Sequence, residues 1–595
     1  MINNLNVNGV TYQNVAKLRV KRAGANTYAD LVDTSDADAL YTEIKQGKKA
    51  YVNGSMVVGS YAPPSIVSPS ASGEVIVGDN QQEVENVISF FDEYGALLHT
   101  IDTTDNTQFP LSELPSLPPA VTNYTFSWNK TLAEVNEMTT GGVVKTNVVA
   151  ASLAPTIYIP DDCGWTGTST TTAVTIVLYF SSLGTGSAIT LTIDWGDGTT
   201  ASTVNISNST THGYVSSSHT FSAGVVHTNP ITITPSSSVG YMIGGYLNTS
   251  YNYGAFGQTQ GSGNYGCLIV KEIRMGDGAT FFKKNSNQSI SNPSGSFRGC
   301  VKLEKIIIPN SVASMGKRNF SDCFSLQNIS LPDSCNFDEG YEFYNCYSLS
   351  NVLLGNTQTK IPEYAFTYCR ALASIKLPNI TAIDTNGFMN CCFSKITLPN
   401  TLTTIGSSAF NTCYALREAT IPSSVTSISN NVYAGCYALN SCIFETGSTL
   451  TTIGGSLFSA CFALEKVVLP SALTSIPSQC FYNCYALKEV IIPDTVTTIG
   501  DYAFYYCFAL INITIPSGVT SIGAQSFYNC CGLRFLTSLP ENVPTLGSNA
   551  LPQIQMNGVS SSYNSTCLYY VPSVSLNSYK TATNWATYAN NMRGI

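Results

Sequence analysis

Side chains able to perform catalysis are few and widely spaced in this sequence. Four histidines occur among 595 residues, and histidine is the side chain that most often serves as a general base. The sequence holds no G-x-S-x-G elbow, no phosphate-binding glycine loop and no H-E-x-x-H motif. The carboxylates of Asp92, Glu93 and Asp102 could form an acid–base group, but their position around a hairpin turn favours plain solvation. We therefore expect no enzymatic activity and no cofactor.

Metal ligands are equally sparse. His212, His219 and His227 do not have the spacing of a zinc site. Asp194 and Asp197 stand close together, but calcium needs about six oxygen ligands, which this segment does not supply. We expect these side chains to be ordinary strand and turn residues and the chain to hold no metal.

A short phrase recurs along the second half of the chain: an aromatic residue, two variable residues and a cysteine. Its eleven cysteines follow one another at intervals of 22 to 25 residues, at Cys300, Cys323, Cys346, Cys369, Cys391, Cys413, Cys436, Cys461, Cys484, Cys507 and Cys530. Because a unit this short cannot bury its own apolar face, the period predicts a solenoid of stacked coils. We expect these cysteines to be buried, unbonded and to act as small hydrophobes. The vicinal pairs Cys391/Cys392 and Cys530/Cys531 are also expected to be free.

One repeat unit shows the elements that build each coil. Residues 487–492 alternate as the inward and outward positions of a strand, which Pro493 ends because it has no N–H for the ladder. A second apolar step follows at 496–499, after which Gly500 turns the chain. Residues 504–510 have the i, i+3, i+6 spacing of a turn or short helical piece with one buried stripe. Stacked coils of this kind should lie ~4.8 Å apart.

The repeat resembles the cysteine-containing leucine-rich repeats of the BspA-like family of surface proteins, over residues 297–540. The resemblance implies a solenoid that displays a binding surface, since such repeats serve adhesion. The fold class expected is therefore mainly β and multidomain, with small β modules and an immunoglobulin-like sandwich ahead of a C-terminal leucine-rich-repeat solenoid.

Residues 1–65 are predicted to form an N-terminal virion-attachment module. Short β-like runs precede a helical stretch over 36–47 and a hairpin around Asn53-Gly54, a pair that favours two-residue turns. The phrase DADALYTEIKQGKKAYVNGSMVVGSY is similar to one in the N-terminal parts of phage tail and fibre proteins. The resemblance implies a place on a virus particle, where this module would bind other virion proteins.

Two further modules are predicted before the repeats. Residues 66–158 form a small α+β module with a linker, in which two strands flank a turn and a helix lies near 131–138. Residues 159–245 resemble the PKD domain, an immunoglobulin-like β-sandwich, because LTIDWGDGTTASTV is followed by the segment HTF at 219–221. The Gly-Asp-Gly segment is expected to turn a hairpin, and Trp195 to fill the core.

The segments on either side of the repeats are predicted to cover the ends of the solenoid. Residues 246–296 form a loop rich in Gly, Tyr and Asn that leads into the N-terminal cap. Residues 541–595 form a C-terminal cap with one strand and a helix. Tyr579, Trp585 and Tyr588 are expected to cover the last coil, which would otherwise expose an apolar end.

Composition restricts the partners and the location. Charged residues make up 11% of the chain, against ~25% in ordinary soluble domains. A net charge of −9 without a basic stripe argues against nucleic acid, and the absence of an apolar run of about 18 residues argues against membrane insertion. The N-terminal sequence MINNLNVNGVTYQNV has neither the basic nor the apolar region of a Sec signal. We therefore expect a virion protein released by lysis.

Aromatic residues recur directly after the repeat cysteines, and residues of one phase in a solenoid form a row along one face. Half-exposed rings on a weakly charged surface suit a sugar or a protein partner. The alternative is that the rings seal an edge of the repeat, and that the binding surface lies on the strand face or the loops. Tyrosines also precede the cysteines, at Tyr344, Tyr368, Tyr482, Tyr505, Tyr506 and Tyr528. The predicted ligand-binding residues are Tyr347, Tyr414, Tyr437, Phe462, Tyr485 and Phe508.

These observations predict a non-enzymatic fibre or receptor-binding protein of a phage virion. It would bind a cell-surface glycan or protein through the repeat solenoid and be a homo-oligomer on the particle. Three alternatives stay open: a bacterial or protist cell-surface BspA-like adhesin, a capsid decoration or head-fibre protein, and a polysaccharide depolymerase. The adhesin would need an export signal or anchor, and the depolymerase a carboxylate pair on the solenoid or in the 246–296 loop.

Overall fold

The computed structural model describes residues 86–105, 109–121, 124–150, 188–206, 230–236, 272–275, 297–556 and 567–595, and isolated strands of other segments. The described part is mainly β, with few helices. Contacts divide the chain into two compact units. One comprises Met1–Ile88, Ile101–Pro110 and Asn136–Gly142, and the other comprises Ser89–Thr100, Leu111–Val135 and Val143–Ile595.

Six strands are described in the first 65 residues, and they pair as three antiparallel hairpins. In the third hairpin Val52 lies opposite Ser55, as the predicted turn at Asn53-Gly54 requires. The helix predicted over 36–47 lies outside the described residues. The strands are β1 (Ile2–Val7), β2 (Val10–Val15), β3 (Leu18–Lys21), β4 (Tyr28–Leu31), β5 (Lys49–Val52) and β6 (Ser55–Val58).

A four-stranded sheet with the order β8-β7-β10-β9 follows. The predicted helix is present, and it starts with a capping box in which Thr131 and Glu134 bind each other's backbone N–H groups. The elements are β7 (Val87–Phe91), β8 (Leu97–Asp102), β9 (Tyr124–Trp128), α2 (Leu132–Asn136) and β10 (Gly142–Ala150).

Two sheets form the region before the repeats, with the strand orders β14-β13-β16-β11-β20-β22 and β15-β12-β17-β21. The predicted hairpin is present, since β13 pairs with β14 across the Asp194–Gly198 segment, and Trp195 is buried. Strand β20 pairs in parallel with β22, the first strand of the repeats, so the larger sheet continues into the solenoid. The bounds are β11 (Thr156–Tyr158), β12 (Val174–Ser182), β13 (Ile189–Asp194), β14 (Ser202–Ile206), β15 (Tyr214–Phe221), β16 (Ile231–Pro235), β17 (Tyr241–Ile243), β18 (Leu247–Asn248), β19 (Tyr251–Asn252), β20 (Glu272–Arg274) and β21 (Ala279–Phe281).

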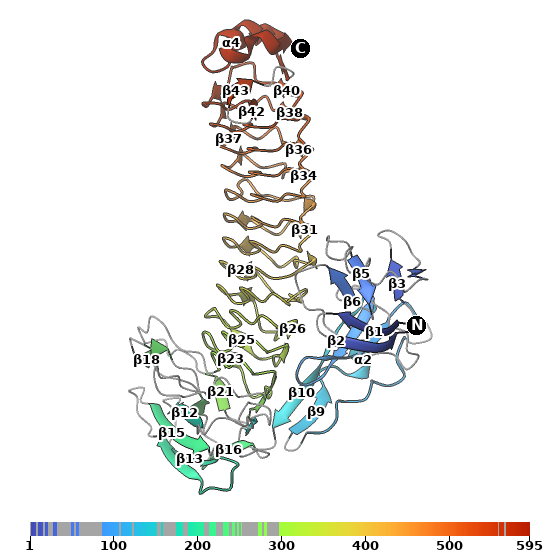
Figure 1. Cartoon of the computed structure of the whole chain (residues 1–595), viewed down its shortest axis with the longest axis vertical. Coiled ribbons are helices and arrows are strands. Elements are labelled where there is room, and N and C mark those ends of the chain that lie inside the picture. The colour runs from blue at the N-terminus through green and yellow to red at the C-terminus, as the bar shows by residue number, and fades with distance from the viewer. Residues whose placement is uncertain are drawn as a thin grey trace. The chain divides into compact units, whose positions relative to one another are not determined.

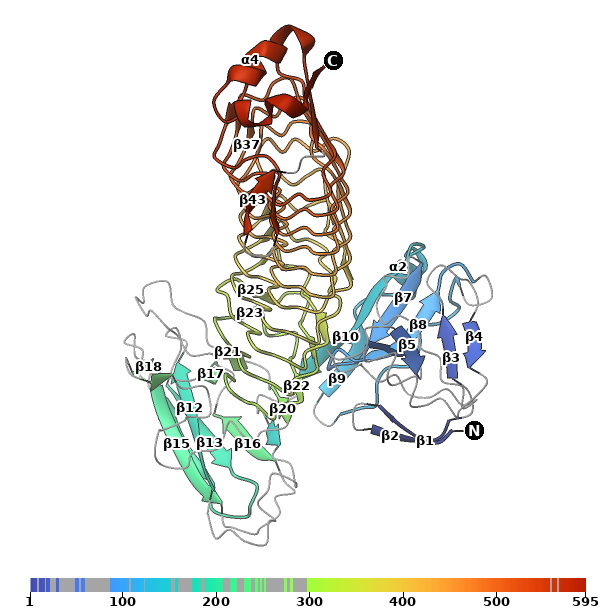
Figure 2. The ribbon, with the colours of Figure 1, turned by 45° about the horizontal axis from the view of Figure 1, so that its top comes forward.

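The repeats form a solenoid whose coils stack one on another (Figures 1 and 2), with two columns of parallel strands. The first column contains β22 (Lys305–Ile307), β24 (Asn328–Ser330), β26 (Asn351–Leu353), β29 (Lys395–Ile396), β31 (Glu418–Ile421), β33 (Ser441–Phe444), β34 (Lys466–Val468), β36 (Glu489–Ile491), β38 (Asn512–Ile515) and β40 (Phe535–Ser538). The second contains β23 (Ser314–Met315), β25 (Asn336–Phe337), β27 (Lys360–Ile361), β28 (Ala382–Ile383), β30 (Thr404–Ile405), β32 (Ser427–Ile428), β35 (Ser475–Ile476), β37 (Thr498–Ile499), β39 (Ser521–Ile522) and β41 (Thr545–Leu546).

The interior of the solenoid is a continuous apolar column. One ring per coil stacks on the ring of the next coil, with centroids 5.0 to 6.0 Å apart, from Phe297 through Tyr433 to Phe527. In the repeat unit at 487–510, Leu487, Val490 and Ile492 are buried as predicted. Stacking coils therefore provide the core that no single unit could form.

The segment between the second strand and the cysteine is a turn and not a helical piece. In most coils the residue two positions before the buried aromatic residue and the residue two positions after it have left-handed backbone, as at Gln479 and Asn483 or at Asn386 and Asn390. Asparagine tolerates this conformation better than most residues. Gly500 does not itself have left-handed backbone: a Cβ there would lie 2.5 Å from the Ser478 nitrogen, so glycine is required because two coils approach closely.

The repeat cysteines are buried and free, as predicted. Each thiol after the first also donates a hydrogen bond to the carbonyl oxygen of the aromatic residue in the preceding coil, with S···O distances of 3.0 to 3.3 Å, as from Cys413 to Phe388. The cysteine is therefore more than a small hydrophobe, because it adds a second hydrogen bond to a buried carbonyl that already accepts a backbone N–H, as at Phe388. Burial raises the pKa of Cys436 to about 12.

Thiol labelling of the native protein is expected to be fast at the exposed Cys531 and far slower at the repeat cysteines. The reason is that the repeat cysteines are buried in the core, where the reagent reaches them only when coils open, and burial also raises the pKa of Cys436 to about 12. Mass spectrometry of peptides after timed labelling would measure this. Fast labelling of most repeat cysteines without denaturant would contradict the buried column.

The predicted C-terminal cap is present, and it holds more than the expected strand and helix (Figure 2). Tyr579, Trp585 and Tyr588 are buried, and the Trp585 indole donates to the Pro544 carbonyl at 2.8 Å. The cap elements are β42 (Gln553–Met556), β43 (Val559–Tyr563), β44 (Leu568–Val571), the 3-10 helix η2 (Ser573–Ser575), α4 (Leu576–Thr581), the 3-10 helix η3 (Ala586–Asn591) and β45 (Met592–Gly594).

Candidate functional site

A row of side chains directly after the repeat cysteines lies on the outside of the turns. We define the aromatic ladder as Phe324, Tyr347, Tyr414, Tyr437, Phe462, Tyr485 and Phe508. The exposed fraction ranges from 37% for Phe324 to 50% for Tyr414, and Phe462 is more covered. The rings are therefore half-exposed.

The five consecutive rings from Tyr414 to Phe508 contact one another. Ring centroids are 4.7 Å apart between Tyr437 and Phe462, 4.8 Å between Phe462 and Tyr485, and 5.2 Å between Tyr485 and Phe508. Because these pairs are nearly parallel, each ring face meets its neighbour, and ring edges and hydroxyls are left for solvent. A ligand lying along the ladder would meet edges and hydroxyl groups, and flat stacking would occur at the two ends.

The structure separates Tyr347 from the other predicted binding residues. It stacks on Phe324 at 5.0 Å, and the Arg370 guanidinium lies 5.4 Å from its ring centroid. Arg370 and the half-buried Cys392 occupy the two positions after repeat cysteines that lie between Tyr347 and Tyr414. The ladder thus consists of a short first segment and a continuous five-ring segment.

The tyrosines that precede the cysteines form a second row of contacts. Tyr505 stacks between Tyr482 and Tyr528, at centroid distances of 5.0 and 5.4 Å. Tyr344 and Tyr368 meet edge to face at 5.9 Å. These rings are half-buried, so they expose less area than the ladder.

The strand face carries exposed apolar residues that the sequence analysis did not single out. We define the aliphatic stripe as Ile443, Val468 and Ile491, which are 56%, 49% and 46% exposed and lie side by side on β33, β34 and β36. The signal was available, because these residues occupy outward positions in strands whose inward positions are already apolar.

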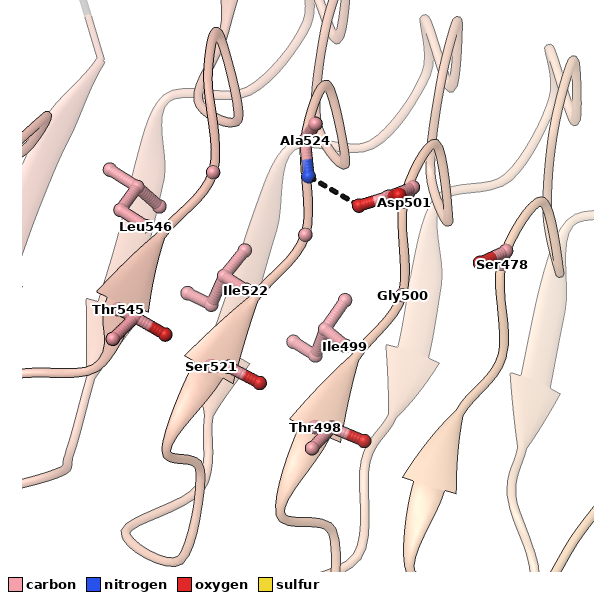
Figure 3. Close-up of a pocket in the computed structure, with 12 residues that line it drawn as sticks. Ser478, Thr498, Ile499, Gly500, Asp501, Ser521, Ile522, Ala524, Thr545 and Leu546 are labelled. Atoms are coloured by element: carbon pink, nitrogen blue, oxygen red, sulfur yellow. Dashed lines mark hydrogen bonds between the residues drawn. The ribbon is translucent and has the colours of Figure 1, made fainter.

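Two shallow grooves run beside the second strand column. The larger measures about 540 Å³, and Figure 3 shows Ile499, Ile522 and Leu546 in one row with the hydroxyl groups of Ser521 and Thr545 in another. The isoleucines are almost fully buried in the core. This groove offers hydroxyl and backbone groups but no titratable pair.

The second groove measures about 430 Å³ and is acidic. Of its carboxylates, Glu363 lies 3.5 Å from the Lys317 ammonium and Asp384 lies 4.0 Å from that of Lys360. Lysine therefore offsets part of the negative charge. Among the described residues no group of three or more His, Cys, Asp or Glu side chains could hold a metal ion.

Comparison with known proteins identifies the repeats. The family model described as a BspA type leucine rich repeat region, in 6 copies, matches residues 288–416, 381–509 and 451–571. Residues 288–571 are a BspA-type leucine-rich repeat region. The matched segments begin at residue 288, so the likenesses of the preceding residues to phage fibres and PKD domains stay predictions. No curated protein matches the chain.

Solved structures of leucine-rich repeat proteins are also similar to this chain. One from Bacteroides ovatus is 28% identical, with a TM-score of 0.42, and covers 56% of this chain and 86% of its own. A leucine rich cell surface protein from Faecalibacterium prausnitzii is 24% identical, with a TM-score of 0.33, and covers 51% of this chain and 84% of its own. The pneumococcal vaccine antigen PcpA is 14% identical, with a TM-score of 0.24, and covers 55% and 83%.

Outside the BspA-type region, the Trp-Gly-Asp-Gly turn has a structural role. The Asp197 carboxylate lies 2.7 Å from the His219 ring nitrogen, and that ring stacks on Trp195 at 5.0 Å. Burial raises the pKa of Asp197, but hydrogen bonds from Thr199 and His219 outweigh it and lower the pKa to about 2. These contacts tie the turn to strand β15.

The expectation of plain solvation at the 92–95 turn is wrong for Glu93, which is 5% exposed. Burial raises the pKa of Glu93 to about 7, and the nearby charge of Asp92 adds to the effect. Asp102 accepts hydrogen bonds from Thr104, which lower its pKa.

No described helix is long and apolar enough to cross a membrane.

Proposed function

We propose that this chain is a surface-exposed recognition protein of the adhesin class, without enzymatic activity. It binds a cell-surface glycan or protein through the aromatic ladder. The observation that supports the proposal is the run of five half-exposed rings from Tyr414 to Phe508 on a BspA-type repeat region. Because every coil repeats one geometry, the surface is preformed and binding orders few side chains.

A cell-surface protein is favoured over a virion fibre. The BspA-type match supports a surface repeat protein. The fibre-like phrase at 36–61 falls mostly on residues outside the described part, so attachment to a particle stays a prediction. A depolymerase is disfavoured because Glu363 and Asp384, in the acidic groove, lie near lysines.

Replacing Tyr414, Tyr437 and Tyr485 together with serine is expected to weaken cell attachment by about a hundredfold or more. Each ring removed should cost ~1 kcal/mol of binding or more, because the ligand loses contact with a ring edge and a hydrogen bond to its hydroxyl group. Because these rings are half-exposed, the melting temperature should change far less than attachment does. Binding of labelled protein to cells and thermal melting would be measured side by side.

A matched control replaces Tyr482, Tyr505 and Tyr528 with serine. This variant also loses three tyrosine side chains, but from the second row, where the rings stack as well. It should keep attachment. A well-folded ladder variant with unchanged attachment would overturn the proposal, and loss only in the control would move the binding surface to the second row.

A further inference from the structure

The aliphatic stripe continues a face that the chain already uses for docking. In the first coils the outward strand residues Ser330 and Leu353 are only 7% and 6% exposed. Gly95 covers them closely, since a Cβ at that position would lie 2.9 Å from the Ile329 carbonyl group. The Lys145 ammonium on β10 donates to the Leu331 and Leu354 carbonyl oxygens at 3.0 and 2.9 Å. Gly95 and Lys145 thus occupy part of the strand face of the first coils.

Further along the same column the face is apolar and uncovered among the described residues. The outward residues of β31, β33, β34, β36 and β38 are, in order, Thr420, Ile443, Val468, Ile491 and Thr514. Three aliphatic residues in a row, all about half-exposed, lie between two threonines. A contiguous apolar patch at an existing docking face marks an interaction surface.

The charges beside the aliphatic stripe are arranged so that two copies of the chain would complement each other. Lys466 and Glu489 lie opposite each other in register and their charged atoms are 2.9 Å apart. In the neighbouring position Glu465 and Lys488 also lie 2.9 Å apart, with the signs exchanged. A twofold axis parallel to the strands and passing between β34 and β36 would set each lysine of one copy opposite a glutamate of the other.

We propose that the aliphatic stripe is the contact surface for a second copy of this chain. Under the twofold axis Val468 meets Ile491 of the other copy, and the two lysine–glutamate pairs form quartets at the border. Such an isologous contact closes on itself and does not propagate. Because the stripe is small, the dimer is reversible, with a dissociation constant in the micromolar range, about 1–100 µM.

The charge pattern favours a second copy over another protein. A twofold dimer requires opposite charges at the positions that the axis relates, as at Lys466 and Glu489 and at Glu465 and Lys488, whereas an unrelated partner places no such condition on these pairs. The contact also leaves the aromatic ladder unused, so it does not depend on the proposed function. The dimer would present two aromatic ladders in place of one and so raise avidity.

The test uses sedimentation of the full chain and two single variants, Lys466→Glu and Glu489→Lys. Each variant alone places like charges across the axis and should dimerise at least about tenfold more weakly than the original chain. An equimolar mixture of the two restores opposite charges across the axis and should dimerise as the original chain does. Pairing within one chain cannot produce this rescue, because each variant chain keeps its own like-charged pair.

Ile491→Lys should also abolish dimerisation, and Val574→Lys is its control. Val574 is an aliphatic residue of the cap that is 82% exposed, so this change has the same chemistry away from the stripe and should leave dimerisation unaltered. A chain that stays monomeric at about 100 µM, or a mixture that fails to recover dimers, would overturn the proposal. Altered cell attachment by monomeric variants would measure the contribution of avidity. It would not change the outcome of the ladder test.

Discussion

Replacing Glu342 with glutamine is expected to stabilise the folded chain by up to about 4–5 kcal/mol near pH 9 and by almost nothing below about pH 4. Glu342 lies in the turn of the second coil, directly before Phe343 of the core column, and its side chain is fully buried. Neither carboxyl oxygen has a well-formed hydrogen bond in the described part of the chain, and only the backbone N–H groups of Glu342 itself and of Gly340 lie near enough to favour its charged form. A buried, unpaired carboxylate is among the most unfavourable groups in a protein interior.

The direction of the pH dependence follows from the pKa. Burial raises the pKa of Glu342 from 4.5 to about 8, against the opposing effect of the backbone N–H groups of Glu342 and Gly340, while the charge of Glu339 adds to the shift and Lys317 reduces it. Between these pH values the folded state holds a proton that the unfolded state has lost. The free energy of unfolding of the original chain therefore falls as the pH rises from 4.5 to about 8. Glutamine is always neutral and removes this fall.

Denaturant unfolding at several pH values would measure the effect. The control is Glu418→Gln, the same chemical change at an exposed position of β31, which should alter stability by less than about 0.5 kcal/mol at every pH. Parallel pH profiles for the original chain and the Glu342 variant would show that this carboxyl group does not titrate between its unfolded and folded values.

The repeat period was enough to predict the coil, its strand and its core. The spacing of Leu487, Val490 and Ile492 fixes which side of the strand faces inward, because alternation leaves one choice. The left-handed turn residues were not predicted, although asparagines directly before the repeat cysteines, such as Asn483 and Asn529, carry that signal. The hydrogen bond of each thiol to the preceding coil was also missed, because it depends on the stacking distance and not on the type of residue.

The candidate site was predicted in position but not in geometry. The phase of Tyr414 and Tyr437 after the cysteine indicates a row on one face, and the structure brings these rings together. Neighbouring coils are one strand spacing apart. This distance brings successive rings into face-to-face contact. The aliphatic stripe was missed although its signal was present, because the alternation that turns Val490 and Ile492 inward also turns Ile491 outward.

Replacing Trp585 with alanine is expected to destabilise the end of the solenoid by about 3–5 kcal/mol. Trp585 is fully buried, meets Tyr579 edge to face at 5.0 Å, and donates to the Pro544 carbonyl at 2.8 Å. Tyr579 in turn donates to the Pro540 carbonyl at 2.8 Å. The alanine variant loses the ring area and leaves a buried carbonyl unsatisfied, so the last coils lose their cover.

Because each coil contacts only its neighbours, the damage should stay local. Hydrogen exchange read by mass spectrometry should show faster exchange over 535–571, while coils 297–420 stay protected. Trp585→Phe is the control, since it keeps an aromatic ring, although a smaller one, and removes the hydrogen bond, at a cost of about 1–3 kcal/mol. Uniform exchange along all coils in the alanine variant would mean that the solenoid unfolds as one cooperative block, and unchanged exchange over 535–571 would mean that Trp585 does not hold the cap. In the expected case the exposed end of one molecule can stack on that of another, so the alanine variant should also aggregate at concentrations where the phenylalanine variant does not.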